Sequence, residues 1–435
     1  MHRRHLLRAI ATGLGATTAL STRAAADSGT PRIRWRFATG DRVSASPTVL
    51  DDTVFVGSED HRLYALDATT GTQQWAIGTD GAIHASPMVV DGTAIVATGA
   101  GTVYAIDVAR STPVWTYQTN GPIGASPLAV DTHVITASED GTVFAIHAPS
   151  RRARWRVDTD GPVGASPVVV DDTVYVGGGD GWVYAFDHMT GDPRWRVDIG
   201  RWVLASPTVV DGTLYIGGAN DNVFRREAAD GDQRWTFDTG DLVLSSPTVA
   251  DGTVFVGGVL DVISAIDAET GRLQWTCRTG DGDDRIYAID TATGAMTWSA
   301  DTRGTVDSSP TVADGRVFVG SRDGTVRAFE AATGAPRWTL ETGGAVNASP
   351  IVVDGIVYVG SADSRCYAID AGVDGSSIDS RVRLGTLGHH DGWSAPPSTR
   401  DRTTTDDTGD STRLALVAGI GGVATATVAH HRSSE

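Results

Sequence analysis

The sequence contains no lysine, so all 35 of its lysine-plus-arginine residues are arginines. Acidic residues number 53, and the formal net charge is −18. A chain this acidic lacks the basic patches by which proteins bind nucleic acid, so we expect no nucleic-acid partner. Strong acidity with arginine in place of lysine also fits a salt-adapted surface, on which dissolved ions screen the self-repulsion.

Cysteine is scarce as well, with only Cys277 and Cys366. The two residues fall in different repeats of the chain, and we expect them to be too far apart for a disulfide bond. No Cys-x-x-Cys motif, adjacent cysteine pair or zinc-ligand spacing occurs, and the Asp-rich turns lack the alternating oxygen ligands of a calcium loop. We therefore expect two buried, unpaired thiols and no bound metal.

Long apolar runs are few, and the most conspicuous covers residues 414–429 near the C-terminus. Sixteen helical residues span about 24 Å, whereas the hydrocarbon core of a membrane is about 30 Å thick. The preceding residues 372–413 are rich in Ser, Thr and Asp and resemble a disordered tether. We expect residues 414–429 to form a C-terminal membrane anchor, and a Gly- and Ala-rich tail is the alternative.

The N-terminus has the features of an export signal. Arg3 and Arg4 precede a mildly apolar run at residues 9–20 and the small residues Ala24–Ala26. This order is typical of a secretory signal, and the paired arginines resemble the twin-arginine type. We expect residues 1–26 to be a signal peptide and the mature protein to be extracytoplasmic.

The most informative feature is an eleven-residue phrase, Ala-x-Asp-x-x-x-Gly-x-x-x-Trp, that recurs along the chain. Seven tryptophans lie 40 residues apart from Trp35 to Trp275, and two more end the later copies. A fixed period of this length indicates a repeat architecture. The residues of the phrase on which we rely are Trp35, Trp75, Trp115, Trp155, Trp195, Trp235, Trp275, Trp298, Trp338, Asp67, Gly71, Asp107, Asp187, Gly191, Asp267 and Gly271.

One period contains four short apolar runs separated by turn residues. Asp91-Gly92, like its counterparts in other copies, is a strong signal for a two-residue hairpin turn. Four short strands repeated at this spacing predict a blade of a β-propeller. Eight Ser-Pro pairs mark eight first strands, which predicts eight four-stranded antiparallel blades over residues 31–371.

Two features interrupt the regular count. The copy that ends at Trp298 lacks its first two strands, so we expect an extra two-stranded hairpin between blades six and seven; nine blades with one stunted is the alternative. The copy that begins at Ala368 has no closing tryptophan, whereas residues 33–37 around Trp35 have no blade of their own. We expect this N-terminal strand to complete blade eight and close the ring.

The repeated phrase resembles the tryptophan-docking motif of the PQQ-like β-propeller family. The resemblance implies that each tryptophan stacks between neighbouring blades, against the Gly peptide, and that the Asp holds the turn. Among such propellers, the chain is similar in architecture to the cofactor-free barrel-assembly propeller lipoprotein. The related quinoprotein dehydrogenases use adjacent cysteines and a Glu/Asn/Asp calcium set, which we do not find here, so we expect no PQQ and no other cofactor.

The positions that differ between blades carry the functional hypothesis. The turns that precede the first strands are mostly polar or glycine but are apolar in blades five and six, and turns expected on the same face add Trp182 in blade four and Val259-Leu260 in blade six. The predicted patch consists of Trp182, Trp202, Leu204, Leu242, Leu244, Val259 and Leu260. An apolar patch on an acidic surface indicates a site for a protein partner, and the alternative is that these side chains plug the mouth of the channel.

From these features we expect a monomeric, non-catalytic scaffold that binds proteins at the cell surface. We assign no catalytic residue, because no nucleophile, base and orienting group can be matched by spacing. A PQQ-dependent dehydrogenase and a sugar- or polymer-binding surface protein are the alternatives.

Overall fold

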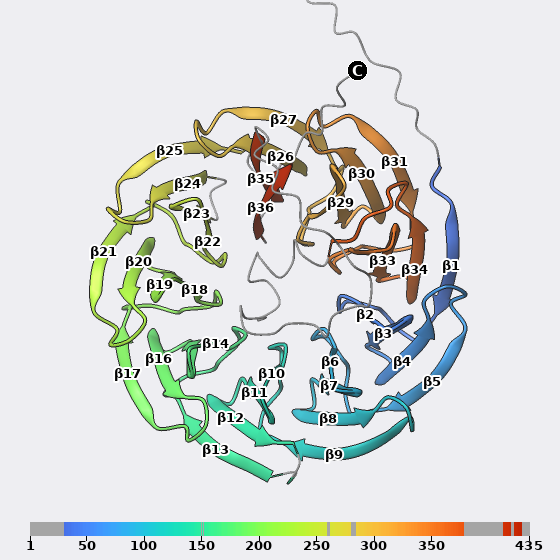
Figure 1. The fold of residues 1–435 in the computed structure, drawn as a ribbon, viewed down its shortest axis with the longest axis horizontal. Coiled ribbons are helices and arrows are strands. Elements are labelled where there is room, and N and C mark those ends of the chain that lie inside the picture. The colour runs from blue at the N-terminus through green and yellow to red at the C-terminus, as the bar shows by residue number, and fades with distance from the viewer. Residues whose placement is uncertain are drawn as a thin grey trace, which may run out of the picture.

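The computed structural model describes residues 30–148, 150, 152–258, 262–279 and 284–377, together with the backbone of residues 412–418 and 422–428. These residues form β-strands, turns and extended segments. The strands make nine four-stranded antiparallel sheets, and Figure 1 shows them arranged in a ring. The all-β propeller expected from the repeats is confirmed.

The first six blades follow one another along the chain, each with its strands in sequence order. The strands of blades one to three are β2 (Thr48–Leu50), β3 (Thr53–Ser58), β4 (Arg62–Asp67), β5 (Gln73–Gly78), β6 (Met88–Val90), β7 (Thr93–Ala97), β8 (Thr102–Asp107), β9 (Thr112–Gln118), β10 (Leu128–Val130), β11 (His133–Ala137), β12 (Thr142–His147) and β13 (Arg152–Asp158). Those of blades four to six are β14 (Val168–Val170), β15 (Thr173–Gly177), β16 (Trp182–Asp187), β17 (Pro193–Asp198), β18 (Thr208–Val210), β19 (Thr213–Gly217), β20 (Asn222–Glu227), β21 (Gln233–Asp238), β22 (Thr248–Ala250), β23 (Thr253–Gly257), β24 (Val262–Asp267) and β25 (Leu273–Arg278).

The remaining three sheets complete the ring. Blade seven contains β28 (Thr311–Ala313), β29 (Arg316–Ser321), β30 (Thr325–Glu330) and β31 (Pro336–Glu341). Blade eight contains β32 (Ile351–Val353), β33 (Ile356–Ser361), β34 (Arg365–Asp370) and β1 (Ile33–Ala38). A further sheet, here called the composite blade, contains β26 (Arg285–Asp290), β27 (Met296–Asp301), β35 (Thr412–Ala418) and β36 (Gly422–Val428).

The turns of each blade give the ring two distinct faces. The turn between the first and second strands lies beside the turn between the third and fourth, as the hydrogen bond from Ala68 N to Asp52 O at 2.8 Å shows. We call this side the docking face. The segments that connect one blade to the next lie on the opposite side with the turn between the second and third strands, and Glu59 N donates to Arg42 O there at 2.9 Å. We call this side the linker face.

The tryptophans of the repeated phrase join each blade to its neighbour. Trp35 Nε1 donates to Ala68 O at 2.8 Å, and Trp155 and Trp298 make the same bond to the carbonyl oxygens of His188 and Ala331. Each acceptor lies in the third turn of the next blade. A large ring that is buried while its N–H is satisfied is suited to joining two sheets.

The glycine of the phrase makes room for the indole. Gly71 has a φ of +70°, and a Cβ atom at this position would lie 2.5 Å from Trp35 Cδ2. In blade two, Ser111 stands where most other copies have glycine, and its φ is also positive, at 55°. The backbone conformation of this turn is therefore common to both sequences, and glycine adds the space for a ring.

The N-terminal strand lies in the last blade of the chain. β1 pairs antiparallel with β34, with Trp35 opposite Ala368. Blade eight then contacts blade one through Ser349 N, which donates to Ser46 Oγ at 3.0 Å, and through Tyr358 Oη, which donates to Ala68 O at 3.1 Å. Residues from the two ends of the repeat region thus meet in the ring, as Figure 1 shows.

The composite blade differs from the two-stranded hairpin that the repeat count predicts. β26 and β27 form that hairpin, but β26 also pairs with β35, from Ile286 opposite Ala418 to Asp290 opposite Leu414. β35 pairs in turn with β36. The short repeat is completed by strands from the C-terminal end of the chain, so the ring has a ninth four-stranded sheet.

This pairing also replaces the predicted membrane anchor. Residues 414–429 were expected to span a membrane as a helix, but residues 412–418 and 422–428 are strands of the composite blade. Within the described ranges, the structure has no helix with the length and apolar character needed to cross a membrane. Alternating Val, Ala and Thr residues suit a strand as well as a short apolar helix. The strand is favoured because β26 would otherwise have an unpaired edge. Both cysteines are buried and unpaired, as expected.

The glycine of the docking turn offers a test of this packing. Gly191 has a φ of +74°, and a Cβ atom there would lie 2.6 Å from Trp155 Cγ; Gly212 has a φ of +71° and open space around it. Gly212→Ala should therefore cost only the left-handed backbone conformation, about 1–2 kcal/mol. Gly191→Ala should cost at least about 3 kcal/mol, because the methyl group displaces the indole. Chemical denaturation measures both, and equal losses would contradict the docking role of Gly191.

Candidate functional site: an apolar rim on the linker face

Each blade begins with a short extended segment on the linker face. The carbonyl oxygen of one residue in this segment accepts a hydrogen bond from the backbone of the turn between the second and third strands. In blade five, for example, Trp202 O accepts from Ala219 N at 3.0 Å. The residues at this position in blades one to eight are Arg42, Ala82, Pro122, Pro162, Trp202, Leu242, Thr305 and Ala345. Large apolar side chains therefore occur here only in blades five and six.

The backbone directs alternate side chains of these segments outward. Val203 and Val243 are buried, each with 1% of its surface exposed. The residues on either side point to solvent: the exposed fractions are 63% for Trp202, 47% for Leu204, 37% for Leu242 and 36% for Leu244. These four residues are the apolar rim. Their exposure favours a surface patch over side chains that fold inward and plug the channel.

The two segments of the apolar rim lie side by side. Ser206 N donates to Ser246 Oγ at 3.1 Å, and Thr208 Oγ1 donates to Pro247 O at 2.6 Å. Each bond joins a backbone group of one blade to a side-chain hydroxyl of the other, within two to four residues of Leu204 and Leu244. The apolar side chains consequently come from adjacent blades on one face.

The other members of the predicted patch lie differently. Trp182 is half-buried at the start of β16, and the Arg196 guanidinium carbon lies 4.8 Å from the centre of its ring. This cation–π contact covers part of the indole, so Trp182 offers less free surface than Trp202. Val259 and Leu260 fall outside the described residues.

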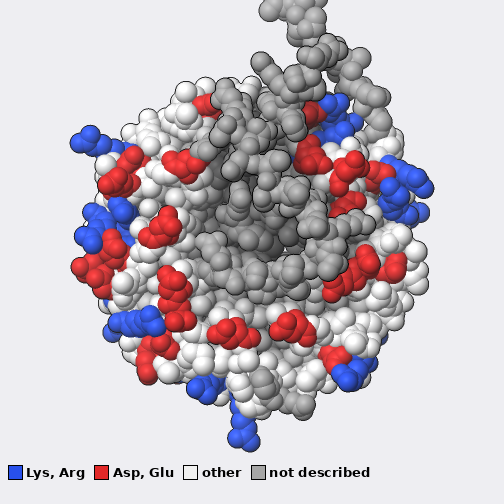
Figure 2. Space-filling model, in the orientation of Figure 1, with Lys and Arg blue, Asp and Glu red and all other residues white. Residues whose placement is uncertain are grey.

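Charge is distributed unevenly on the face shown in Figure 2. Acidic side chains lie between the centre and the edge of the disc, whereas the arginines lie mostly at its edge. Several arginines form ion pairs with the repeated phrase or its surroundings, for example Arg194 with Asp187 at 2.8 Å and Arg34 with Asp370 at 2.9 Å. The Arg194 guanidinium and the turn N–H groups lower the pKa of Asp187 to about 2. This pattern opposes binding of a polyanion.

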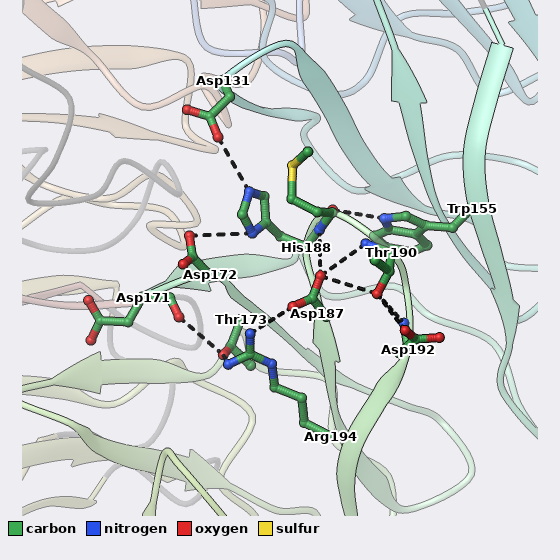
Figure 3. Close-up of polar contacts among 11 residues, drawn as sticks. Asp131, Trp155, Asp171, Asp172, Thr173, Asp187, His188, Thr190, Asp192 and Arg194 are labelled. Carbon is green, nitrogen blue, oxygen red and sulfur yellow. Dashed lines mark hydrogen bonds and ion pairs between the residues drawn. The ribbon is translucent and has the colours of Figure 1, made fainter.

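A second unusual cluster lies on the docking face between blades three and four. Figure 3 shows His188 between two carboxylates: its Nε2 lies 3.3 Å from Asp131 Oδ2 and its Nδ1 lies 3.6 Å from Asp172 Oδ1. The His188 side chain is 5% exposed, and its carbonyl oxygen accepts the hydrogen bond from Trp155. Sequence reasoning missed this residue, although a signal exists, because most other blades have alanine at the position of His188.

His133 lies in the same region and is almost fully buried. Its ring centre is 5.2 Å from that of His147, its partner across the β11–β12 ladder. Neither ring nitrogen of His133 has a hydrogen-bond partner in the described part of the chain. Burial, followed by the nearby His147, lowers the pKa of His133. The folded protein therefore favours the neutral form of this imidazole.

Across the described ranges, no three His, Cys, Asp or Glu side chains are grouped so that they could hold a metal ion. The ring geometry and the indole docking instead define the chain as a β-propeller of the tryptophan-docked class, with an apolar rim on one face.

The chain belongs to the PQQ_2 family, which is described as outer membrane protein assembly factor BamB. The family model matches residues 21–131, 120–199, 179–283 and 278–382. No curated protein sequence matches the chain.

Solved structures share the fold. BamB from Moraxella catarrhalis superposes with a TM-score of 0.59 and 19% identity, over 78% of this chain and 100% of that one. The computationally designed Ika8 protein superposes with a TM-score of 0.56 and 17% identity, over 77% of this chain and 97% of that one. At this identity the two structures support the propeller fold alone.

The buried imidazole of His133 predicts a pH dependence. A lowered pKa means that His133 contributes stability above its unfolded pKa of about 6.5 and that this contribution is lost as the pH falls. Between pH 7 and 5, the parental protein should lose more stability than His133→Thr. This variant has the residue type found at the equivalent positions Thr53, Thr93 and Thr173 of other blades. At pH 7 the two should differ by no more than about 1 kcal/mol.

Denaturation midpoints measured at both pH values check this prediction. The charged groups that act on His133 are His147, Arg154, His188 and Asp131, and they are unchanged in the variant. Equal losses of stability in the two proteins would show that His133 does not titrate in this range.

Proposed function

We propose that the protein is a non-catalytic, extracytoplasmic scaffold that binds a protein partner through its apolar rim. The observation that carries the proposal is the exposure of Trp202, Leu204, Leu242 and Leu244 on adjacent blades, at positions where other blades have small or polar residues. Contiguous exposed apolar surface on a soluble protein marks an interaction site, and tryptophan is the residue most enriched among binding hot spots.

The family relationship supports the same role. The matching family model is described as an outer membrane protein assembly factor, a role that involves other proteins. The paired arginines of residues 1–26 support export of the folded chain. The composite blade uses residues 412–428, so the proposal needs no membrane-spanning segment.

The exposed indole also suits a second function. Aromatic rings stack on the apolar faces of sugars, and Trp202 is exposed enough to do so. A polymer-binding protein would show quenching or a shift of Trp202 emission when soluble oligosaccharides are added. A protein scaffold would show neither, but would lose partner capture when the leucines of the apolar rim are removed.

The test compares two variants with matched positions. Trp202→Ala/Leu242→Ala removes two of the four side chains of the apolar rim, whereas Arg42→Ala changes the equivalent exposed position in blade one. Both should melt like the parent, because all three side chains are exposed. The double variant should weaken capture of the partner more than tenfold, since a tryptophan hot spot contributes about 2 kcal/mol or more.

Partner capture is measured with a photo-crosslinker at Leu204 in the extracytoplasmic fraction, with crosslinked proteins identified by mass spectrometry. The same protein should be crosslinked by parent and Arg42→Ala and lost from the double variant. If all three proteins capture the same partners equally, the apolar rim is not the binding site. A double variant that melts well below the parent would show that these side chains belong to the core.

A further inference from the structure

The two halves of the composite blade come from distant parts of the chain. In blade six, residues 239–261 connect β21 to β24 and include the two inner strands. In the composite blade, only residues 279–284 connect β25 to β26, so this position in the sequence has no inner strands of its own. The inner edge of β26 is satisfied by a segment more than one hundred residues later in the chain.

The core of the composite blade depends on that edge. Ile286, Ala288 and Ile289 are fully buried, and Tyr287 is 4% exposed. β26 pairs on one side with β27 and on the other with β35, over Ile286 to Asp290. A strand edge inside a ring cannot be left bare, because unpaired backbone groups away from water each cost free energy.

The strands that fill the site form a self-contained hairpin. β35 and β36 pair along their whole lengths, from Thr412 opposite Val428 to Ala418 opposite Gly422. β36 makes its further contacts with β22 and β23 of blade six. The hairpin therefore enters the ring as a unit between blades six and seven, as Figure 1 shows.

We propose that the inner edge of β26 is a binding site for a β-hairpin, and that its resident ligand is the chain's own residues 412–428. Recognition is by strand addition, in which the main chain of β26 supplies hydrogen bonds to the main chain of the ligand. The hairpin is a separable ligand, so a free peptide of the same sequence can take its place.

The hairpin bound to β26 belongs to the same chain as β26. Residues 378–411 join Ser377 to β35, and a chain of this length spans at most about 110 Å, well beyond the size of one blade. A ligand joined to its site through the same chain has a local concentration in the millimolar range, above that of a second copy in solution. The connection is thus long enough for the hairpin to leave and return, and short enough to favour its own β26.

The test uses the full chain with a weakened hairpin. Leu416 lies at the centre of β35, which pairs on both sides, so Leu416→Pro removes a ladder hydrogen bond whichever way its N–H points. Thr404→Pro, in residues 378–411, is the matched control. Hydrogen exchange of the amides of Ile286–Asp290 should become about 100-fold faster in Leu416→Pro and stay unchanged in Thr404→Pro.

A labelled peptide of residues 412–428 then probes the vacated edge. It should bind Leu416→Pro saturably by fluorescence anisotropy and restore slow exchange at Ile286–Asp290. The same peptide carrying the proline should not bind. Thr425→Pro provides a second variant, because β36 does not pair with β26 and the proline weakens the hairpin without touching the acceptor strand.

Four results would overturn the proposal. Exchange that is equally slow in parent and both hairpin variants would show that β26 does not depend on the hairpin. Fast exchange without peptide binding, or loss of the whole fold in both variants, would show that the hairpin is an inseparable part of the blade. A parent that elutes as a dimer, with exchange that depends on protein concentration, would place the occupant in a second copy.

Discussion

At six of the nine junctions between blades, an indole lies against a glycine turn of the neighbouring blade, and the rest of the ring depends on this contact. The Trp235 N–H reaches Ala268 O at 3.1 Å, and a Cβ atom on Gly271 would lie 2.6 Å from Trp235 Cγ. Burying one such ring removes about 150–250 Å² from water, and the contact recurs around the ring. Because a single repeat unit cannot bury its apolar faces alone, the docked tryptophans make the blades one cooperative structure.

The regular repeats form the ring, and the features specific to this protein lie where the sequence departs from the repeat. The docking turns differ little, and even Ser111 keeps the positive φ of the glycine it replaces. Three places depart from the pattern: the apolar rim, the His188 junction and the composite blade. The first is an exposed surface, the second a buried polar contact, and the third a blade assembled from distant parts of the chain.

Much of this architecture could be predicted from the sequence because the signals are local and repeated. Asp91-Gly92 encodes a tight turn, with φ values of 46° and 69°, and the Trp–Gly spacing predicts the contact between blades. The structure of residues 414–429 could not be predicted from those residues alone, since a run of small apolar residues suits a strand, a tail or a short anchor. Only the missing inner strands beside β26 distinguish these choices, and that is information from another part of the chain.

The candidate site was predicted in part. Alternation within the linker segments places Trp202 and Leu204 outward, and their exposed fractions of 63% and 47% agree with a surface patch. Trp182 is a tryptophan like Trp202, but its surroundings differ, because it begins a strand and lies under Arg196. His188 could have been found by aligning the repeats and asking which copy departs from alanine. A tertiary contact of this kind is visible in sequence only as an exception to the repeat.

The most direct test of indole docking is a double-mutant cycle at the junction of blade six and the composite blade. Trp275 Nε1 donates to Thr291 O at 3.0 Å, and a Cβ atom on Gly294 would lie 2.5 Å from Trp275 Cδ2. Gly294→Ala should cost at least about 3 kcal/mol in the parent but only about 1–2 kcal/mol in Trp275→Leu, where the indole is gone. Effects that add to within about 0.5 kcal/mol would mean that the two residues do not interact, and would contradict docking as the contact that holds the ring together.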